Sequence, residues 1–97
     1  MSTLIWSSDT GEKGSYEVDV LLNTNEKFVF VDVNKKGVRR ELTLLPTPSG
    51  KLHSHTIPNS NPDWCVYVGS LIGSALNGRW RRDDDAYGKE GDFEIRP

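Results

Sequence analysis

Two histidines separated by a single residue are the side chains in this sequence best spaced to bind a metal ion. His53 and His55 lie in the polar segment Lys51–Ile57, which we expect to be a strand. Side chains two positions apart on a strand share a face, so both imidazoles could reach one ion. A zinc site needs at least a third protein ligand, and no residue stands at a suitable spacing nearby. We therefore predict two histidines on a solvent-exposed face, with no metal site and no cofactor.

The single cysteine, Cys65, could act as a nucleophile if a histidine base and an orienting aspartate stood beside it. Nothing in the sequence brings such partners to it, and Cys65 lies in the apolar run Trp64–Val68, where a free cysteine usually packs as a small hydrophobic side chain. One cysteine also excludes an internal disulfide and a thiolate metal site. The chain has no nucleophile elbow, phosphate-binding loop, paired catalytic carboxylates or zinc motif. We therefore expect a protein that is not an enzyme.

Arginines cluster in two segments that could form a contact surface. Arg39 and Arg40 follow a glycine turn, and Arg79 and Arg81 flank Trp80. Arginine and aromatic residues are enriched at the centres of protein interfaces, and together they can also stack the bases of a single-stranded nucleic acid. A net charge of −2 opposes nucleic-acid binding. The aspartates at 83–85 lack the ligand spacing of a calcium loop, so we expect them to form a solvated loop.

Length and composition predict one globular domain over residues 1–97. Hydrophobic residues make up 35% of the chain and charged residues 27%, which is not the composition of a disordered segment. No apolar run approaches the length of a membrane span, and the first residues do not have the pattern of a signal peptide. We therefore expect a cytoplasmic protein that does not associate with membranes.

The elements that must position these side chains are short strands. Glycine, proline, asparagine and aspartate interrupt the chain every eight to twelve residues, and no long segment carries a helical apolar stripe. The tight turn at 34–37 is the clearest hairpin, because asparagine and glycine tolerate positive φ. The expected strands are Leu4–Ser7, Ser15–Leu22, Lys27–Val33, Val38–Leu45, Lys51–Ile57, Asp63–Leu71, Ser74–Arg82 and Gly91–Arg96.

Strands of this number and length need either a closed barrel or two packed sheets, since one open sheet would leave bare edges and a bare face. We predict an all-β fold, a small antiparallel barrel or flattened barrel of about eight short strands, with a two-sheet sandwich as the alternative. The short last strand favours closure, because it gains most when both of its edges are paired.

The segment Lys27–Val33 differs from the other strands in being apolar on both faces. One row contains Phe28 and Phe30, and the other contains Val29, Val31 and Val33. One row must face the core, and the other becomes a candidate contact patch for a partner or a second subunit.

The C-terminal third of the chain resembles a known family. The segments Val68–Trp80 and Gly91–Ile95 follow the pattern Leu-x-Gly-x-Trp, a charged loop and Gly-x-Phe-x-Ile, which is similar to hairpins of small calycin-like barrels of the lipocalin and avidin type. The matching residues are Gly78, Trp80, Gly91, Phe93 and Ile95. Those families place Gly-x-Trp in their first strand, whereas this chain has no glycine two residues before Trp6. The resemblance implies a barrel with an interior ligand pocket.

Three functions follow from these patterns. The favoured one is a small non-enzymatic protein that contacts another protein or itself, as an inhibitor, immunity or accessory factor, including phage-encoded ones. Its interface candidates are Phe28, Phe30, Arg39, Arg40, Arg79 and Arg81. The alternative is a calycin-like barrel that binds a small apolar or amphipathic ligand, with pocket candidates His53, His55, Trp64, Tyr67 and Trp80. Single-stranded nucleic-acid binding is the second alternative.

Serine at both Phe28 and Phe30 separates the two orientations of the doubly apolar strand. The double variant is expected to lose self-association if the rings are exposed, and to unfold if they are core. Circular dichroism and size-exclusion chromatography of the variant distinguish these outcomes.

Overall fold

The computed structural model describes residues 2–33, 37–54, 65–82 and 90–97, and these residues form a closed antiparallel barrel of eight strands. The predicted all-β barrel is therefore confirmed over the sandwich. No helix within these ranges is long and apolar enough to cross a membrane. The strands are β1 (Ser2–Ser8), β2 (Lys13–Thr24), β3 (Lys27–Val33), β4 (Arg39–Pro46), β5 (Leu52–Ser54), β6 (Val66–Ile72), β7 (Ala75–Arg81) and β8 (Glu90–Arg96).

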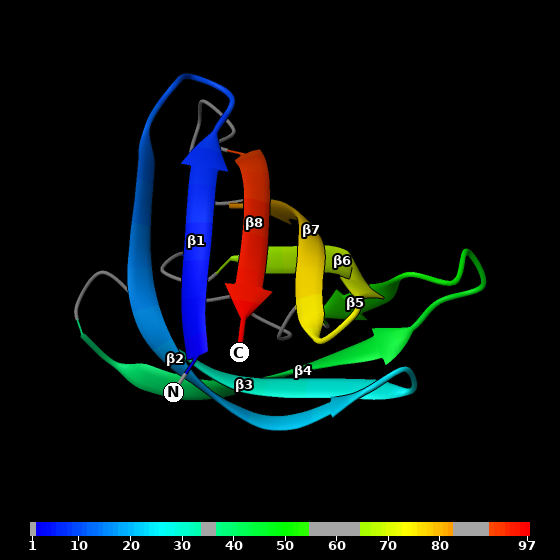
Figure 1. Ribbon diagram of the computed structural model, residues 1–97. Helices are drawn as coiled ribbons and strands as arrows, with labels where there is room; N and C mark the ends of the chain where they lie inside the picture. Colours follow the sequence, from blue (N-terminus) through cyan, green and yellow to red (C-terminus); the bar gives the residue numbers. More distant parts are fainter. Residues whose placement is uncertain (1, 34–36, 55–64, 83–89) are drawn as a thin grey trace.

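Each strand pairs with the next along the chain, and β8 pairs with β1 to close the ring. In Figure 1, β1 and β8 run side by side, while β3 and β4 cross beneath them. The long strand β2 curves from the side of β1 to the side of β3 and so joins the two directions. A register shift between Val20 and Leu22 adds one residue, Leu21, on β2. Such a β-bulge increases the bend of its strand.

The inner face of the barrel is apolar because side chains alternate along each strand. Phe28 and Phe30 are both 0% exposed, so they belong to the core, and the valines of β3 point outward. The prediction that the two phenylalanines form a contact surface is therefore wrong. Large rings fill the interior better than valines do, and the serine double variant is expected to unfold. The core residues are Leu4, Val18, Phe28, Phe30, Leu42, Leu44, Leu52, Tyr67, Leu76, Trp80, Phe93 and Ile95.

A chain of edge-to-face aromatic contacts crosses the interior. The ring of Phe30 lies 6.1 Å from that of Phe28 and 5.5 Å from that of Tyr67, and Tyr67 lies 5.0 Å from Phe93. These centroid distances are in the range that favours aromatic pairs beyond the burial of their area. The chain connects strands β3, β6 and β8, none of which pairs with another of the three.

Two tryptophans and the glycines opposite them pack one end of the barrel. Trp6 and Trp80 meet at 87° with their ring centroids 5.9 Å apart. The indole Nε1–H of Trp80 donates to the carbonyl oxygen of Ser7 at 3.0 Å. Gly91 lies opposite Trp80 in the β7–β8 register, and a Cβ there would stand 1.7 Å from the Ser7 oxygen. The Gly-x-Trp and Gly-x-Phe spacings thus place glycine where neighbouring strands approach closely.

The predicted strand positions agree with the structure apart from their ends. β2 begins two residues earlier and ends two residues later than expected, and β6 begins at Val66, whereas residues 63 and 64 of the expected strand lie outside the described residues. The predicted hairpin joins β3 to β4, and Gly37 has a positive φ of 79°. Residues 34–36 of its turn, and residues 55–57 of the expected fifth strand, lie outside the described residues.

Alanine at Gly91 tests this close packing. The added Cβ meets the backbone of β1, so strand separation or backbone movement must follow, and we expect a loss of about 3 kcal/mol or more in the free energy of unfolding. Gly11→Ala is the control, because nothing lies within 4 Å of its Cβ position and only its positive φ of 95° opposes a side chain. It is expected to cost about 1 kcal/mol. Equal losses in urea unfolding would contradict the close-approach role of Gly91.

Candidate functional site

A buried carboxylate held by two tyrosines is the main polar feature of the barrel interior. Asp32 of β3 is only 3% exposed. The hydroxyl of Tyr16 donates to Asp32 Oδ1 at 2.6 Å, and the hydroxyl of Tyr67 donates to Oδ2 at 2.9 Å. The backbone N–H of Val33 donates to Oδ1 at 2.9 Å. The carboxylate therefore joins β2, β3 and β6 through hydrogen bonds of short, favourable length.

The electrostatics of this cluster follow from its burial. Desolvation raises the pKa of Asp32, and the hydrogen bonds from Tyr16 and Tyr67 oppose that rise without cancelling it. Burial, together with the nearby Asp32 charge, raises the pKa of both tyrosines well above their ordinary value. The phenols therefore remain protonated and can continue to donate. The cluster can hold or release a proton at Asp32 inside an apolar enclosure.

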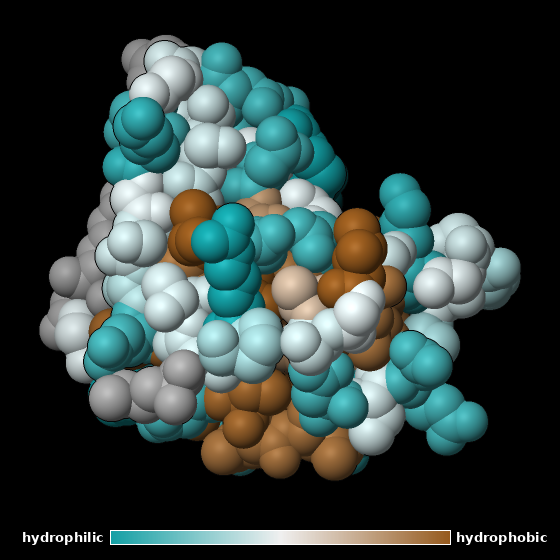
Figure 2. All heavy atoms as spheres, in the orientation of Figure 1, coloured by the Kyte–Doolittle hydropathy of each residue, from teal (hydrophilic) through white to brown (hydrophobic). Residues whose placement is uncertain are grey.

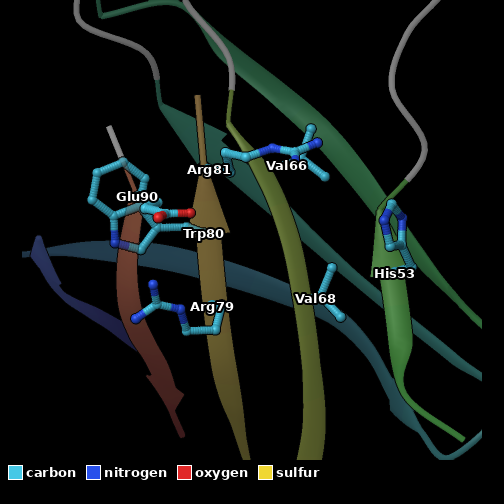
Figure 3. Close-up of a pocket in the computed structure, with 7 residues that line it drawn as sticks. All are labelled: His53, Val66, Val68, Arg79, Trp80, Arg81 and Glu90. Atoms are coloured by element: carbon cyan, nitrogen blue, oxygen red, sulfur yellow. The ribbon is translucent and has the colours of Figure 1, made fainter. Parts of the chain in front are cut away.

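A groove on the outside of the barrel gathers several of the predicted site residues. It has a volume of about 190 Å³ and is lined by His53, Val66, Val68, Arg79, Trp80, Arg81 and Glu90. Figure 3 shows Val66 and Val68 on β6, with His53 on β5 to one side and the arginines of β7 to the other. The two valines are outward-facing because Tyr67 between them points into the core. The groove therefore combines apolar and charged side chains.

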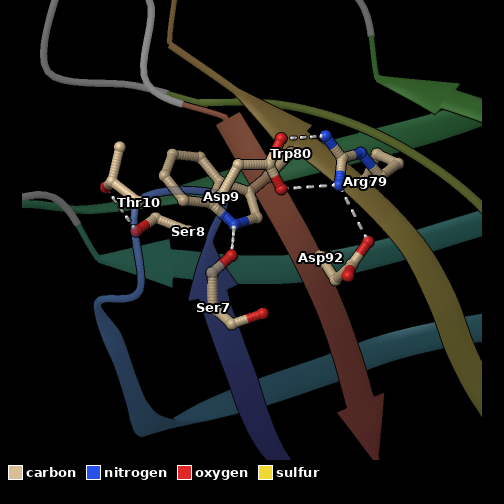
Figure 4. A network of polar contacts seen from close by, with 7 residues as sticks. All are labelled: Ser7, Ser8, Asp9, Thr10, Arg79, Trp80 and Asp92. Atoms are coloured by element: carbon tan, nitrogen blue, oxygen red, sulfur yellow. Dashed lines mark hydrogen bonds and ion pairs between the residues drawn. The ribbon is translucent and has the colours of Figure 1, made fainter.

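Arg79 is held in place by two aspartates, as Figure 4 shows. Its guanidinium donates to both carboxylate oxygens of Asp9, at 3.0 and 2.6 Å, and to Asp92 Oδ1 at 3.1 Å. Hydrogen bonding to Asp9 and Asp92 raises the pKa of Arg79, and the same arginine lowers the pKa of Asp9. Because two carboxylates offset its charge, Arg79 fixes the β1–β2 turn to β7 and β8 more than it offers a positive charge to a partner.

The outer side of β2, β3 and β4 forms an apolar face, which we call the valine face. Val29 at its centre is 5% exposed and pairs in register with Leu22 of β2, which is 40% exposed. The bulge residue Leu21 is 56% exposed. Figure 2 shows hydrophobic side chains gathered along the lower side of the molecule, where β2 and β3 lie. The valine face consists of Leu21, Leu22, Val29, Val31 and Leu45.

The structure separates the remaining predicted site residues. Arg39 pairs with Asp19 at 3.1 Å on the outside of the barrel. Arg40 is half-buried and lies opposite Asp32 in the β3–β4 register. Tyr67 is in the core rather than in the groove. Cys65 is partly buried against the core, as its apolar run predicted. His55 and Trp64 lie outside the described residues.

The prediction that no metal site forms was based on His53 and His55, of which the structure describes His53. His53 Nδ1 lies 2.6 Å from the backbone oxygen of Ser54. No group of three or more histidine, cysteine, aspartate or glutamate side chains in the described ranges could hold an ion.

Sequence analysis missed the Asp32 cluster, although the pattern of β3 contains a signal for it. Asp32 has the same parity as Phe28 and Phe30, so it shares their face of the strand. Once the phenylalanines are placed in the core, Asp32 must enter the core too. A buried carboxylate needs donors, and Tyr16 has the inward parity of β2 beside Val18. The partner Tyr67 could not be found this way, because it comes from the opposite wall.

Comparisons of the chain with protein-family models, with curated proteins and with solved structures give no match. The interpretation of these surfaces therefore depends on their physical chemistry.

Asparagine at Asp32 tests the proton affinity of the buried carboxyl. Because the pKa of Asp32 is raised in the folded state, the folded protein binds this proton more tightly than the unfolded chain does. The contribution of Asp32 to the free energy of unfolding is therefore greatest at low pH, and it is lost as the pH rises through the folded-state pKa. Asp32→Asn removes that loss, and its stability relative to wild type should increase between about pH 4 and pH 8.

Urea unfolding across that pH range provides the measurement. Asp19→Asn, which removes an exposed carboxylate from the neighbouring strand, is the control for loss of a surface charge. If wild type and Asp32→Asn have parallel profiles of stability against pH, the folded state does not raise the proton affinity of Asp32.

Proposed function

We propose that this protein is a small non-enzymatic binding protein that acts by contacting another protein through the valine face. The observation that carries the proposal is the pair of exposed leucines of β2, Leu21 and Leu22, which lie beside the outward-facing, partly covered valines of β3. Strands with one face on the core usually present polar residues on the other. Apolar side chains gathered on an outer face are typical of a contact site.

The surroundings of the valine face match the composition of protein interfaces. Interfaces combine an apolar centre with a polar and charged rim. Here the Asp19–Arg39 ion pair and the exposed Lys27 and Glu41 surround the apolar centre. A protein of this kind could serve as an inhibitor, an immunity protein or an accessory factor. A single, partly buried cysteine, Cys65, suits the reducing cytoplasm in which we propose to place the protein.

Binding of a small ligand inside the barrel is the second candidate. It is supported by the resemblance of β7 and β8 to calycin-like hairpins, and by the Asp32 cluster, which could orient a polar group within an apolar enclosure. It ranks lower because the aromatic chain from Phe28 to Phe93 occupies the middle of the interior. An eight-strand barrel is only just wide enough for its own side chains.

Glutamate at Leu22 tests the proposed contact face. Leu22 is exposed, so the charge should leave the fold intact while placing a carboxylate in the apolar centre of the interface, and we expect binding to weaken at least tenfold. Native mass spectrometry of tagged protein isolated from its own host measures the retained partner.

Val68→Glu is the matched control. Val68 is also an outward-facing apolar residue, but it lies in the groove on β6, four strands away around the barrel. Loss of the retained protein only in Leu22→Glu would support the valine face. Loss only in Val68→Glu would assign the contact to the groove and overturn the proposal. A retained small molecule whose binding is lost in Asp32→Asn would favour the second candidate.

A further inference from the structure

We propose that the valine face binds the valine face of a second copy of this chain, with the strands of the two copies antiparallel across the contact. This inference rests on the proposed function and names the partner of the same surface. It is carried by the distribution of charge around the apolar centre.

The strand registers arrange the outward residues in rows. The central row contains Leu22, Val29 and Thr43. Two positions further along β3 lies the row of Asp19, Val31 and Glu41. Two positions in the other direction, Lys27 stands beside Thr24 of β2. Each row is about 7 Å from the next, from the rise per residue of a strand.

The charges on either side of the centre have opposite signs. The two carboxylates of Asp19 and Glu41 flank Val31 on one side, and the ammonium group of Lys27 lies on the other side. Asp19 already pairs with Arg39. Lys27 and Glu41 form no ion pair within the described parts of the chain, and both are exposed. They are therefore available to a partner.

One two-fold arrangement of the two copies brings these opposite charges together. Its axis lies in the plane of the contact and runs perpendicular to the strands. It places the central row over itself, so the exposed Leu22 side chains of the two copies meet beside the largely covered Val29. It also places Lys27 of each copy over Val31 of the other. Strands are about 4.8 Å apart, so Lys27 can reach the Glu41 carboxylate on the adjacent strand. The contact then contains two symmetric Lys27–Glu41 pairs around an apolar centre.

The other two-fold arrangement is disfavoured by the same charges. With the axis along β3, every row lies over itself with β2 and β4 exchanged, so Lys27 faces Lys27 and Glu41 faces Asp19. Like charges placed opposite one another across a contact act against that pairing. The antiparallel arrangement is therefore the one that the charge distribution selects.

The area of the valine face limits how tightly two copies can associate. Three strands of about seven residues cover roughly 14 by 23 Å, which is smaller than the surface that each partner of a standard interface buries. We therefore expect a weak dimer, with a dissociation constant between about 1 µM and several hundred µM.

Charge exchange provides the test, with purified protein in sedimentation equilibrium at concentrations up to about 1 mM. Lys27→Glu and Glu41→Lys alone should each weaken self-association about tenfold or more, because each replaces two attractive pairs by two repulsive ones. The double variant Lys27→Glu/Glu41→Lys should regain wild-type self-association within a few-fold. The double variant is also the control for folding, because it carries both substitutions.

The possible results separate the two proposals. Failure of the double variant to regain self-association would overturn the antiparallel arrangement. If the wild type stays monomeric at about 1 mM while Leu22→Glu still loses a host partner, the second copy is the wrong occupant and the proposed function stands. If the wild type stays monomeric and Leu22→Glu loses no host partner, both proposals are wrong.

Discussion

The interior width of an eight-strand barrel is the constraint on which the rest of this structure depends. A closed ring of this size leaves room for one layer of side chains from each wall. Here aromatic rings from β3, β6 and β8 meet edge to face across that space. Because β3 directs Phe28 and Phe30 inward, its valines have to face outward. The apolar outer surface is therefore a consequence of how the core is filled.

Asp32 is the exception within this apolar interior. Taking a carboxylate out of water is costly, and hydrogen bonds must replace the lost hydration. Three donors do so here, and two of them are tyrosines whose rings also pack with apolar neighbours. The two tyrosines therefore stabilise the core in two ways. Their rings pack against apolar side chains, and their hydroxyls donate hydrogen bonds to the Asp32 carboxylate. The hydrogen bond from Tyr67 also joins β6 to β3, two strands that share no pairing.

The fold was largely predictable because its main signals are local. Alternation along β2, the glycine turn after β3 and the density of turn residues predict short antiparallel strands. The orientation of β3 was not predictable, since each of its rows combines apolar residues with one charged residue, Asp32 beside the phenylalanines and Lys27 beside the valines, and period-two patterning cannot distinguish them. The candidate sites depend on contacts between distant strands. Arg79 shows this, because its partner Asp9 is 70 positions away and only barrel closure brings them together. Sequence patterning therefore found the groove arginines but not the two aspartates that offset the charge of Arg79.

The pairing of β1 with β8 has a consequence for how the chain folds. The ladder joins residues from Ser8 with Gly91 to Thr3 with Arg96, so its partners are separated by 83 to 93 positions along the chain. Bringing such distant segments together has a high entropic cost, and topologies dominated by long-range pairs fold in milliseconds to seconds. Hairpins such as β6–β7 can form first, while β1 and β8 remain unpaired edges. Until the ring closes, those edges can pair with another chain, so the slowest step of folding is also the step most exposed to aggregation.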